Sequence, residues 1–137
     1  MKVGVVIVTH YGLADEFLQA QRLIIPDGPD FVAVSLDPSQ SVEEMRERIG
    51  AGLKAAEQGD GVLILTDMFG GTPSNMCLSF LDDHRVEVVT GINLPMLIKL
   101  ATLREEKPLE ELATFIKEYG QRNISVASEL LPGGEQP

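Results

Sequence analysis

The sequence predicts an α/β fold: a doubly wound sheet, mainly of four parallel strands, with helices on both faces. Apolar segments of strand length alternate along the chain with segments whose apolar residues recur at helical spacing. Two strand segments, 3–9 and 62–65, are almost entirely apolar, which is typical of strands buried on both faces of a parallel sheet. Right-handed crossovers between parallel strands leave few layouts, and the common one for this number of strands, 2-1-3-4, is the expected order.

Each element has its own signal in the chain. The expected strands occupy residues 3–9, 31–36, 62–65, 85–90 and, at the end, 124–127. The expected helices occupy residues 15–24, 42–56, 73–81, 96–103 and 108–119. Ser41 and Glu44 form the S-x-x-E pattern of a capping box before the second helix. Gly120 is expected to end the last helix.

The composition indicates one acidic domain. Among 137 residues, 11 are Lys or Arg and 21 are Asp or Glu, so the formal net charge is −10, which disfavours nucleic acid and anionic membranes as partners. No apolar run is long enough to span a bilayer and no signal peptide pattern is present, so we expect a cytoplasmic location. The single cysteine, Cys77, is expected to be buried. Residues 1–128 are expected to form the domain, and residues 129–137 a flexible tail.

The segment 61–75, GVLILTDMFGGTPSN, joins a buried strand to the features of an anion site. Asp67 follows the strand at its carboxyl end. Gly70 and Gly71 allow a tight turn and let backbone N–H groups approach a ligand closely. Thr72 is expected to cap the next helix, with the following proline at the first helical position. A helix that starts in this way favours an anion such as phosphate.

His10 ends the first strand and is expected to lie beside Asp67. In the order 2-1-3-4 the first and third strands are neighbours, and their carboxyl ends mark the point where open α/β sheets bind ligands. A carboxylate beside a histidine accepts the Nδ1–H bond and leaves Nε2 as a free nucleophile. Attack of Nε2 on a phosphoryl donor would give a phosphohistidine. The N–H groups of Gly70, Gly71 and Thr72 would stabilise its charge without a metal or other cofactor.

Three motifs resemble the IIA domains of the mannose-type sugar phosphotransferase system: VTHYGLA around His10, TDMFGGTPSN around Asp67 and TGINLPML after the fourth strand. The resemblance covers essentially the whole expected domain. It implies a phosphoryl relay in which His10 takes phosphate from the phosphocarrier protein HPr and passes it to a separate IIB protein. It also implies an acid such as Asp67 behind the histidine and a hydroxyl residue such as Thr72 near the phosphate. Family members are homodimers in which the last strand, here 124–127, adds antiparallel to the partner's sheet.

Other residues near the strand ends have less specific signals. Met68 and Phe69 are candidates for an apolar rim that contacts a partner protein. Asn93 lies in a loop at the same edge of the sheet, and the sequence leaves open whether it serves the site or only the turn. His84 comes just before a strand, hence at the opposite edge, and is expected to lie in a surface turn.

Three classes of function remain open at this point. The first is the relay phosphotransferase, and the second is a regulatory phospho-sensor on the same scaffold with no transport acceptor. The third, a nucleotide- or flavin-binding domain, is disfavoured because the chain has no G-x-G-x-x-G after the first strand and no G-x-x-x-x-G-K-[ST]. Asp67 is the rival phosphate carrier, but its acyl phosphate would need a Mg²⁺ site, for which no second acid lies immediately at the ends of the first and third strands.

Overall fold

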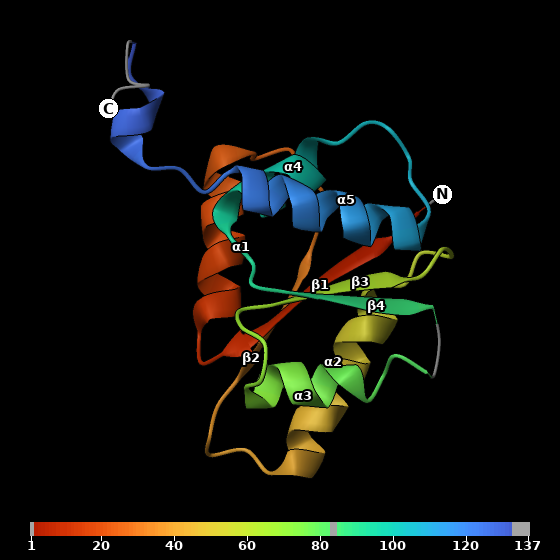
Figure 1. Ribbon diagram of the computed structural model, residues 1–137. Coiled ribbons are helices and arrows are strands. Elements are labelled where there is room, and N and C mark those ends of the chain that lie inside the picture. Colours follow the sequence, from red (N-terminus) through yellow and green to blue (C-terminus); the bar gives the residue numbers. More distant parts are fainter. Residues whose placement is uncertain (1, 83–84, 133–137) are drawn as a thin grey trace.

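The computed structural model describes residues 2–82 and 85–132 and has three layers, with a sheet between two layers of helices (Figure 1). The strands are β1 (Gly4–His10), β2 (Val32–Leu36), β3 (Val62–Thr66) and β4 (Val86–Thr90). The helices are α1 (Leu13–Ile24), α2 (Val42–Ala56), α3 (Thr72–Leu78), α4 (Leu94–Thr102) and α5 (Leu109–Arg122), followed by a 3-10 turn, η1 (Ala127–Leu130). Helices α1, α4 and α5 cover one face of the sheet, and α2 and α3 cover the other.

The sheet confirms the predicted order β2-β1-β3-β4, with every neighbouring pair parallel. In the register between the two central strands, Val8 lies opposite Thr66. His10 at the end of β1 and Asp67 just after β3 therefore reach the same carboxyl edge of the sheet, although 57 residues separate them in the chain.

Alternate residues of β1 build two separate apolar cores. Val5 and Ile7 pack in the core shared with α1, α4 and α5. Val6 and Val8 pack in the core shared with α2 and α3. Because side chains alternate across a strand, His10 continues the second series and points toward the layer that contains α3. The alternation therefore places the imidazole on the side of the loop that precedes α3.

Local signals in the helices are confirmed in two places. Ser41 Oγ accepts the Glu44 N–H at 3.1 Å, and the Glu44 carboxylate accepts the Ser41 N–H at 2.7 Å, which completes the capping box of α2. Cys77 is fully buried, and this burial raises the pKa of its thiol to about 12, so the sulfur stays protonated and serves as a small apolar group.

Two predictions about helix ends are wrong. Thr72 is the first residue of α3 and not its cap, because Gly71 is the N-cap in extended conformation and the proline takes one of the first two helical positions. Gly120 does not end α5, which continues to Arg122. A Cβ atom at Gly120 would lie 2.6 Å from Met96 Sδ, so this glycine allows α5 to pack closely on α4.

Residues 124–127 do not form a strand within the described part of this chain. Positions 124–126 have no regular structure, and Ala127 already begins η1. Figure 1 shows this segment leading away from the body of the molecule. A strand needs a neighbour for its N–H and C=O groups, so the exchanged antiparallel strand and the dimer remain predictions.

Some predictions lie wholly or partly outside the described residues. His84, predicted to lie in a surface turn, is one of them, and so is most of the predicted tail, 133–137. The division at residue 128 therefore remains a prediction. None of the helices in the described ranges has both the length and the apolar character needed to cross a bilayer.

Candidate active site

His10 and Asp67 are in direct contact, as the topology predicts. The distance from His10 Nδ1 to Asp67 Oδ2 is 2.8 Å, and the same oxygen accepts the backbone N–H of His10 at 3.1 Å. The second carboxylate oxygen accepts the Met68 N–H at 3.1 Å. Since an ionised carboxylate only accepts hydrogen bonds, Nδ1 is the donor in this contact, and in a neutral imidazole Nε2 then keeps its lone pair.

The two side chains differ in their access to solvent. The Asp67 side chain is only 12% exposed, whereas that of His10 is 42% exposed. The carboxylate is therefore shielded from competing water, and the free edge of the imidazole is open to a reactant. An imidazole that is both oriented and accessible is suited to nucleophilic catalysis.

The two glycines of the loop serve different purposes. Gly70 has φ +93°, a left-handed conformation that side chains rarely adopt. Gly71 is extended, but a Cβ atom on it would lie 2.6 Å from His10 Cε1 and 2.8 Å from Nε2. Gly70 thus makes the turn possible. Gly71, which has no Cβ atom, leaves room for His10 Nε2.

Helix α3 begins directly after Gly71, the glycine next to His10 Nε2. The first N–H groups of an α-helix have no carbonyl partners within the helix. In α3 they begin at Thr72, immediately after the glycine that touches the imidazole. The Thr72 side chain is exposed and makes no capping bond. Free N–H groups at the start of a helix can bind anions.

An apolar rim is part of the same edge, and the sequence reveals only half of it. Met68 and Phe69, predicted as rim residues, are exposed, but so are Tyr11 and Leu13. The signal for the latter two was available, because they fall between His10 and the first helical stripe and have no predicted core to join. Four exposed apolar side chains thus lie within three residues of His10 or Asp67 in the chain, and contact of this rim with a partner protein remains a prediction.

Asn93 has a structural role in this fold. Its Oδ1 accepts the Met96 N–H at 3.2 Å, which caps α4, and its Nδ2 donates to the Gly120 carbonyl at 3.1 Å. One end of the amide therefore binds α4 and the other end binds α5, so Asn93 links the two helices. A role for Asn93 in the site itself remains a prediction.

Sequence reasoning also missed two buried threonines, one before each residue of the reactive pair. Thr9 precedes His10, Thr66 precedes Asp67, and both are fully buried. Their hydroxyl groups lie 3.4 Å and 3.5 Å from the backbone oxygens of Tyr11 and Met68, two positions further along the chain in each case. The signal was the repeated pattern of Thr followed by a polar site residue at a strand's carboxyl end.

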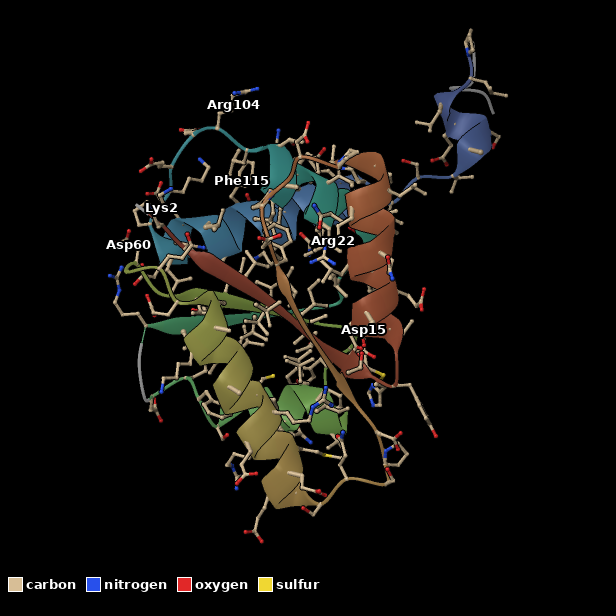
Figure 2. All side chains as sticks on the ribbon, turned by 180° about the vertical axis from the view of Figure 1, so that it is seen from behind. Lys2, Asp15, Arg22, Asp60, Arg104 and Phe115 are labelled. Carbon is tan, nitrogen blue, oxygen red and sulfur yellow. The ribbon has the colours of Figure 1, made fainter. Side chains whose placement is uncertain are left out.

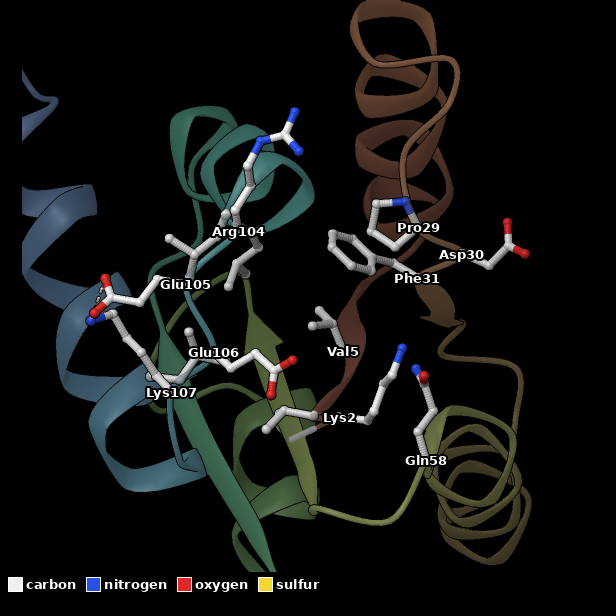
Figure 3. A pocket seen from close by; sticks show the side chains of 14 residues that line it. Lys2, Val5, Pro29, Asp30, Phe31, Gln58, Arg104, Glu105, Glu106 and Lys107 are labelled. Atoms are coloured by element: carbon white, nitrogen blue, oxygen red, sulfur yellow. Dashed lines mark ion pairs between the residues drawn. The ribbon is translucent and has the colours of Figure 1, made fainter.

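A cavity of about 240 Å³ lies at the opposite edge of the sheet (Figure 3). It opens between the connection from α4 to α5 and the amino ends of β1 and β2. Acidic and basic side chains surround it in equal number: Lys2, Arg104, Lys107, Asp30, Glu105 and Glu106. Figure 2 shows how far Lys2 and Asp60 at this edge lie from Asp15 at the start of α1. This cavity is therefore separate from His10 and Asp67, which do not line it.

Within residues 2–82 and 85–132, no group of three or more His, Cys, Asp or Glu side chains is arranged to hold a metal ion. The groups described at the carboxyl edge are an oriented imidazole, a shielded carboxylate and helix N–H groups.

Comparison with known proteins gives a consistent set of relatives. The family model described as PTS system fructose IIA component matches residues 4–117. The fructose-specific EIIA component of Bacillus subtilis (strain 168) is 30% identical over 130 residues, which cover 94% of this chain and 89% of that protein. The mannose-specific EIIAB component of Escherichia coli (strain K12) is 28% identical over 126 residues, but these cover only 39% of that longer protein. The mannose/sorbose specific IIA subunit from Enterococcus faecalis has a similar structure, with a TM-score of 0.83, 28% identity and coverage of 92% of this chain and 95% of that chain.

Proposed function

Since this chain belongs to the mannose-type IIA family of the sugar phosphotransferase system, we propose that it relays phosphoryl groups: His10 accepts phosphate from HPr and passes it to a separate IIB protein. The observation that carries this proposal is the 2.8 Å contact between His10 Nδ1 and Asp67 Oδ2. It supports a tautomer in which Nδ1 carries the proton and Nε2 is the nucleophile. This role belongs in the cytoplasm.

The transfer step balances without any added proton or electron. The lone pair of His10 Nε2 attacks the phosphorus, the Nε2–P bond forms, and the bond between phosphorus and the donor atom breaks with its electron pair remaining on the donor. The proton on Nδ1 stays in place, so the ring of the adduct becomes a cation that the Asp67 carboxylate stabilises. When the IIB acceptor attacks, the electron pair of the Nε2–P bond returns to His10.

The phosphoryl oxygens would be bound by the N–H groups of Gly70, Gly71 and Thr72 and by the Thr72 hydroxyl. The proximity of Gly71 to Nε2 supports this arrangement, because a Cβ atom there would be only 2.8 Å away. Donors that are held in position before the reaction stabilise developing charge more effectively than solvent does.

HPr and the IIB protein would use the same apolar rim in turn. Both must bring a reacting atom to the same nitrogen, and Tyr11, Leu13, Met68 and Phe69 are the exposed apolar side chains next to the reactive pair in the chain. Interfaces of this kind typically have an apolar core and a polar margin. The negative net charge of −10 favours partners with basic contact surfaces.

A dimer is the second part of the proposal. β4 is an edge strand, and a groove of about 360 Å³ runs between it and α5, lined by residues 87–90 of the strand. Ile124 and Val126 are exposed on the segment that leaves the molecule, with the alternation of a strand. Pairing of this segment with β4 of a second copy would cover both surfaces. Ending the chain at Asn123 should then give a monomer or aggregate in light scattering, and a soluble, fully active dimer would contradict the exchange.

The test is incubation with phosphoenolpyruvate, enzyme I and HPr, followed by intact mass measurement with and without a candidate IIB protein. We expect a gain of one phosphoryl group that is lost in mild acid and survives alkali. His10→Ala should abolish it, and His84→Ala, the change of the chain's other histidine, should not. Phosphate that is labile to hydroxylamine, dependent on Mg²⁺ and retained in His10→Ala would assign the carrier to Asp67 instead. Phosphate that no IIB protein removes would favour the regulatory sensor over the relay.

A further inference from the structure

We propose that Thr9 is a positioning residue, whose buried hydroxyl holds the turn after β1 and thereby fixes the direction of the His10 ring. The inference rests on the proposed function of His10 and adds a residue that does not touch the phosphate. Thr9 is fully buried and directly precedes His10. It faces the layer of α1, opposite to the face on which the imidazole lies.

The Thr9 hydroxyl replaces the missing cap of α1. The N-cap position of α1 is Gly12, which has no side chain to accept a hydrogen bond. Thr9 Oγ1 accepts the N–H of Ala14, the second residue of the helix, at 2.7 Å. This is the bond that a Ser, Thr or Asp at the N-cap would otherwise accept. The start of α1 is therefore held by the residue before the histidine.

The same hydroxyl also supports a strained turn. Tyr11 has φ +48°, and it is the one residue other than glycine with a positive φ among those described. Its side chain is exposed, so packing of the ring does not enforce this conformation. The backbone is held by the Tyr11 N–H, which donates to the Leu36 carbonyl at 2.8 Å, and by the Thr9 hydroxyl, 3.4 Å from the Tyr11 carbonyl. Strained conformations persist only where surrounding contacts determine them, and they gather at functional sites.

His10 lies between the anchored Thr9 and the strained Tyr11, so any relaxation of the turn rotates the bond that carries the imidazole. The corresponding point on β3 has more support. There the Thr66 carbonyl accepts two further N–H groups, from Gly91 at 2.9 Å and Ile92 at 3.0 Å. The residue before Asp67 is thus held by two backbone contacts to the loop after β4. The turn after His10 has one such contact, from the Tyr11 N–H, so the Thr9 hydroxyl adds to the orientation that Asp67 gives the His10 ring.

The test compares substitutions that separate the hydroxyl from the volume of the side chain. Thr9→Val keeps the volume and removes the hydroxyl, and we expect phosphorylation of His10 at saturating phosphorylated HPr to slow about 10- to 100-fold, the range for small misplacements of a reacting group. Thr9→Ser keeps the hydroxyl and loses a buried methyl group, so it should stay near the parent rate. Thr102→Val is the matched control, because its hydroxyl bonds to the Ile98 carbonyl at 2.9 Å at the far end of α4.

Thermal unfolding of the same variants distinguishes positioning from stability. If the rate follows the melting temperature, so that Thr9→Ser is as slow as Thr9→Val, the proposal is wrong. Thr9→Val with Gly12→Ser provides a second comparison, since the new serine places a hydroxyl at the N-cap position of α1 without the contact to Tyr11. The position has room, because nothing lies within 4 Å of a Cβ atom at Gly12. We expect this double variant to remain slow, and recovery of the parent rate would overturn the proposal.

A measurement on the free protein keeps this inference separable from the proposed function. The ¹⁵N spectrum of the His10 ring should show the Nδ1–H tautomer in the parent and in Thr9→Ser, and a mixture of tautomers in Thr9→Val. A parent spectrum in Thr9→Val would contradict the positioning role whether or not the protein accepts phosphate. If the parent accepts no phosphate from HPr but the tautomers change as expected, the proposed function fails and the role of Thr9 stands.

Discussion

At the carboxyl edge of the sheet one carboxylate, Asp67, holds one imidazole, whereas the amino edge gathers several charged side chains around an open cavity. Two ion pairs at the amino edge are longer, Lys107 to Glu105 at 3.4 Å and Arg85 to Asp60 at 4.0 Å, and in each pair one side chain is more than half exposed. Exposed pairs of this kind typically contribute only about 0 to 1 kcal/mol to stability. The comparison indicates that one shielded contact with defined geometry can orient a side chain for reaction, whereas several charges exposed to solvent do not orient one another in this way.

The largest effect is expected from Asp67→Asn. The amide is nearly the same shape, but it can present its NH₂ group to Nδ1 and cannot balance a cationic ring, so phosphoryl transfer should fall by about 10² to 10⁴-fold, by analogy with triad acids. The matched control is Asp60→Asn at the amino edge, whose pair with Arg85 is 4.0 Å long. Rates come from single-turnover transfer from phosphorylated HPr. Equal rates for the parent and Asp67→Asn would reduce Asp67 to a loop cap.

The next largest effect is expected from Gly71→Ala. The new methyl group would lie 2.8 Å from Nε2, so the loop must shift or cover the nucleophile, and we expect a loss of about 10²-fold in transfer rate. Gly50→Ala is the control, since nothing lies within 4 Å of a Cβ atom at that helical position and the change should stabilise α2 by about 0.5 to 1 kcal/mol. A parent rate for Gly71→Ala would show that the glycine is not required for access to Nε2.

A smaller effect is expected from Thr72→Ala. Because Thr72 does not cap α3, its loss should leave the melting temperature nearly unchanged, while the missing hydroxyl slows transfer on the order of 10-fold, the low end for groups that support a site. Thr72→Ser retains the hydroxyl and serves as the control. A slow Thr72→Ser variant would assign the effect to the methyl group instead.

The smallest effect is expected from Phe69→Ser on the rim. Removing one exposed aromatic ring should weaken docking of HPr about 5-fold, equivalent to about 1 kcal/mol, and leave the rate at saturating HPr unchanged. Leu23→Ser on α1 removes another exposed apolar side chain as the control. An unchanged apparent affinity in Phe69→Ser would remove this residue from the partner interface.

The sequence was sufficient where the physical signal is local or periodic. The apolar runs of β1 and β3 and the handedness of crossovers left few strand orders, the commonest of them is the one observed, and this order predicted the contact of His10 with Asp67. Where two residues are equally suited to one position, it was not sufficient. Gly71 and Thr72 both make acceptable N-caps, and the close approach of the loop to the imidazole, a tertiary contact, selected the glycine.

Contacts between distant elements account for the remaining misses. Gly120 has the sequence signature of a helix end, but its real constraint is the Met96 sulfur on another helix. Thr9 is an ordinary strand residue by propensity, and its importance emerges only from the position of Ala14 in three dimensions. Residues 124–127 have no strand neighbour within the described residues, so their pairing with a second molecule remains a prediction.

The shared oxygen of Asp67 has a consequence for the direction of the relay. Because Oδ2 binds both the backbone N–H and the ring of His10, the nucleophile is oriented before either partner arrives. The same geometry must serve the arrival of the phosphoryl group and its departure, by microscopic reversibility. In the proposed relay, phosphoryl transfer at this site is therefore reversible. The ratio of phosphorylated donor to unphosphorylated acceptor in the cell sets the net direction of transfer. Return of label from the phosphorylated chain to unlabelled HPr would be the direct sign of this reversibility.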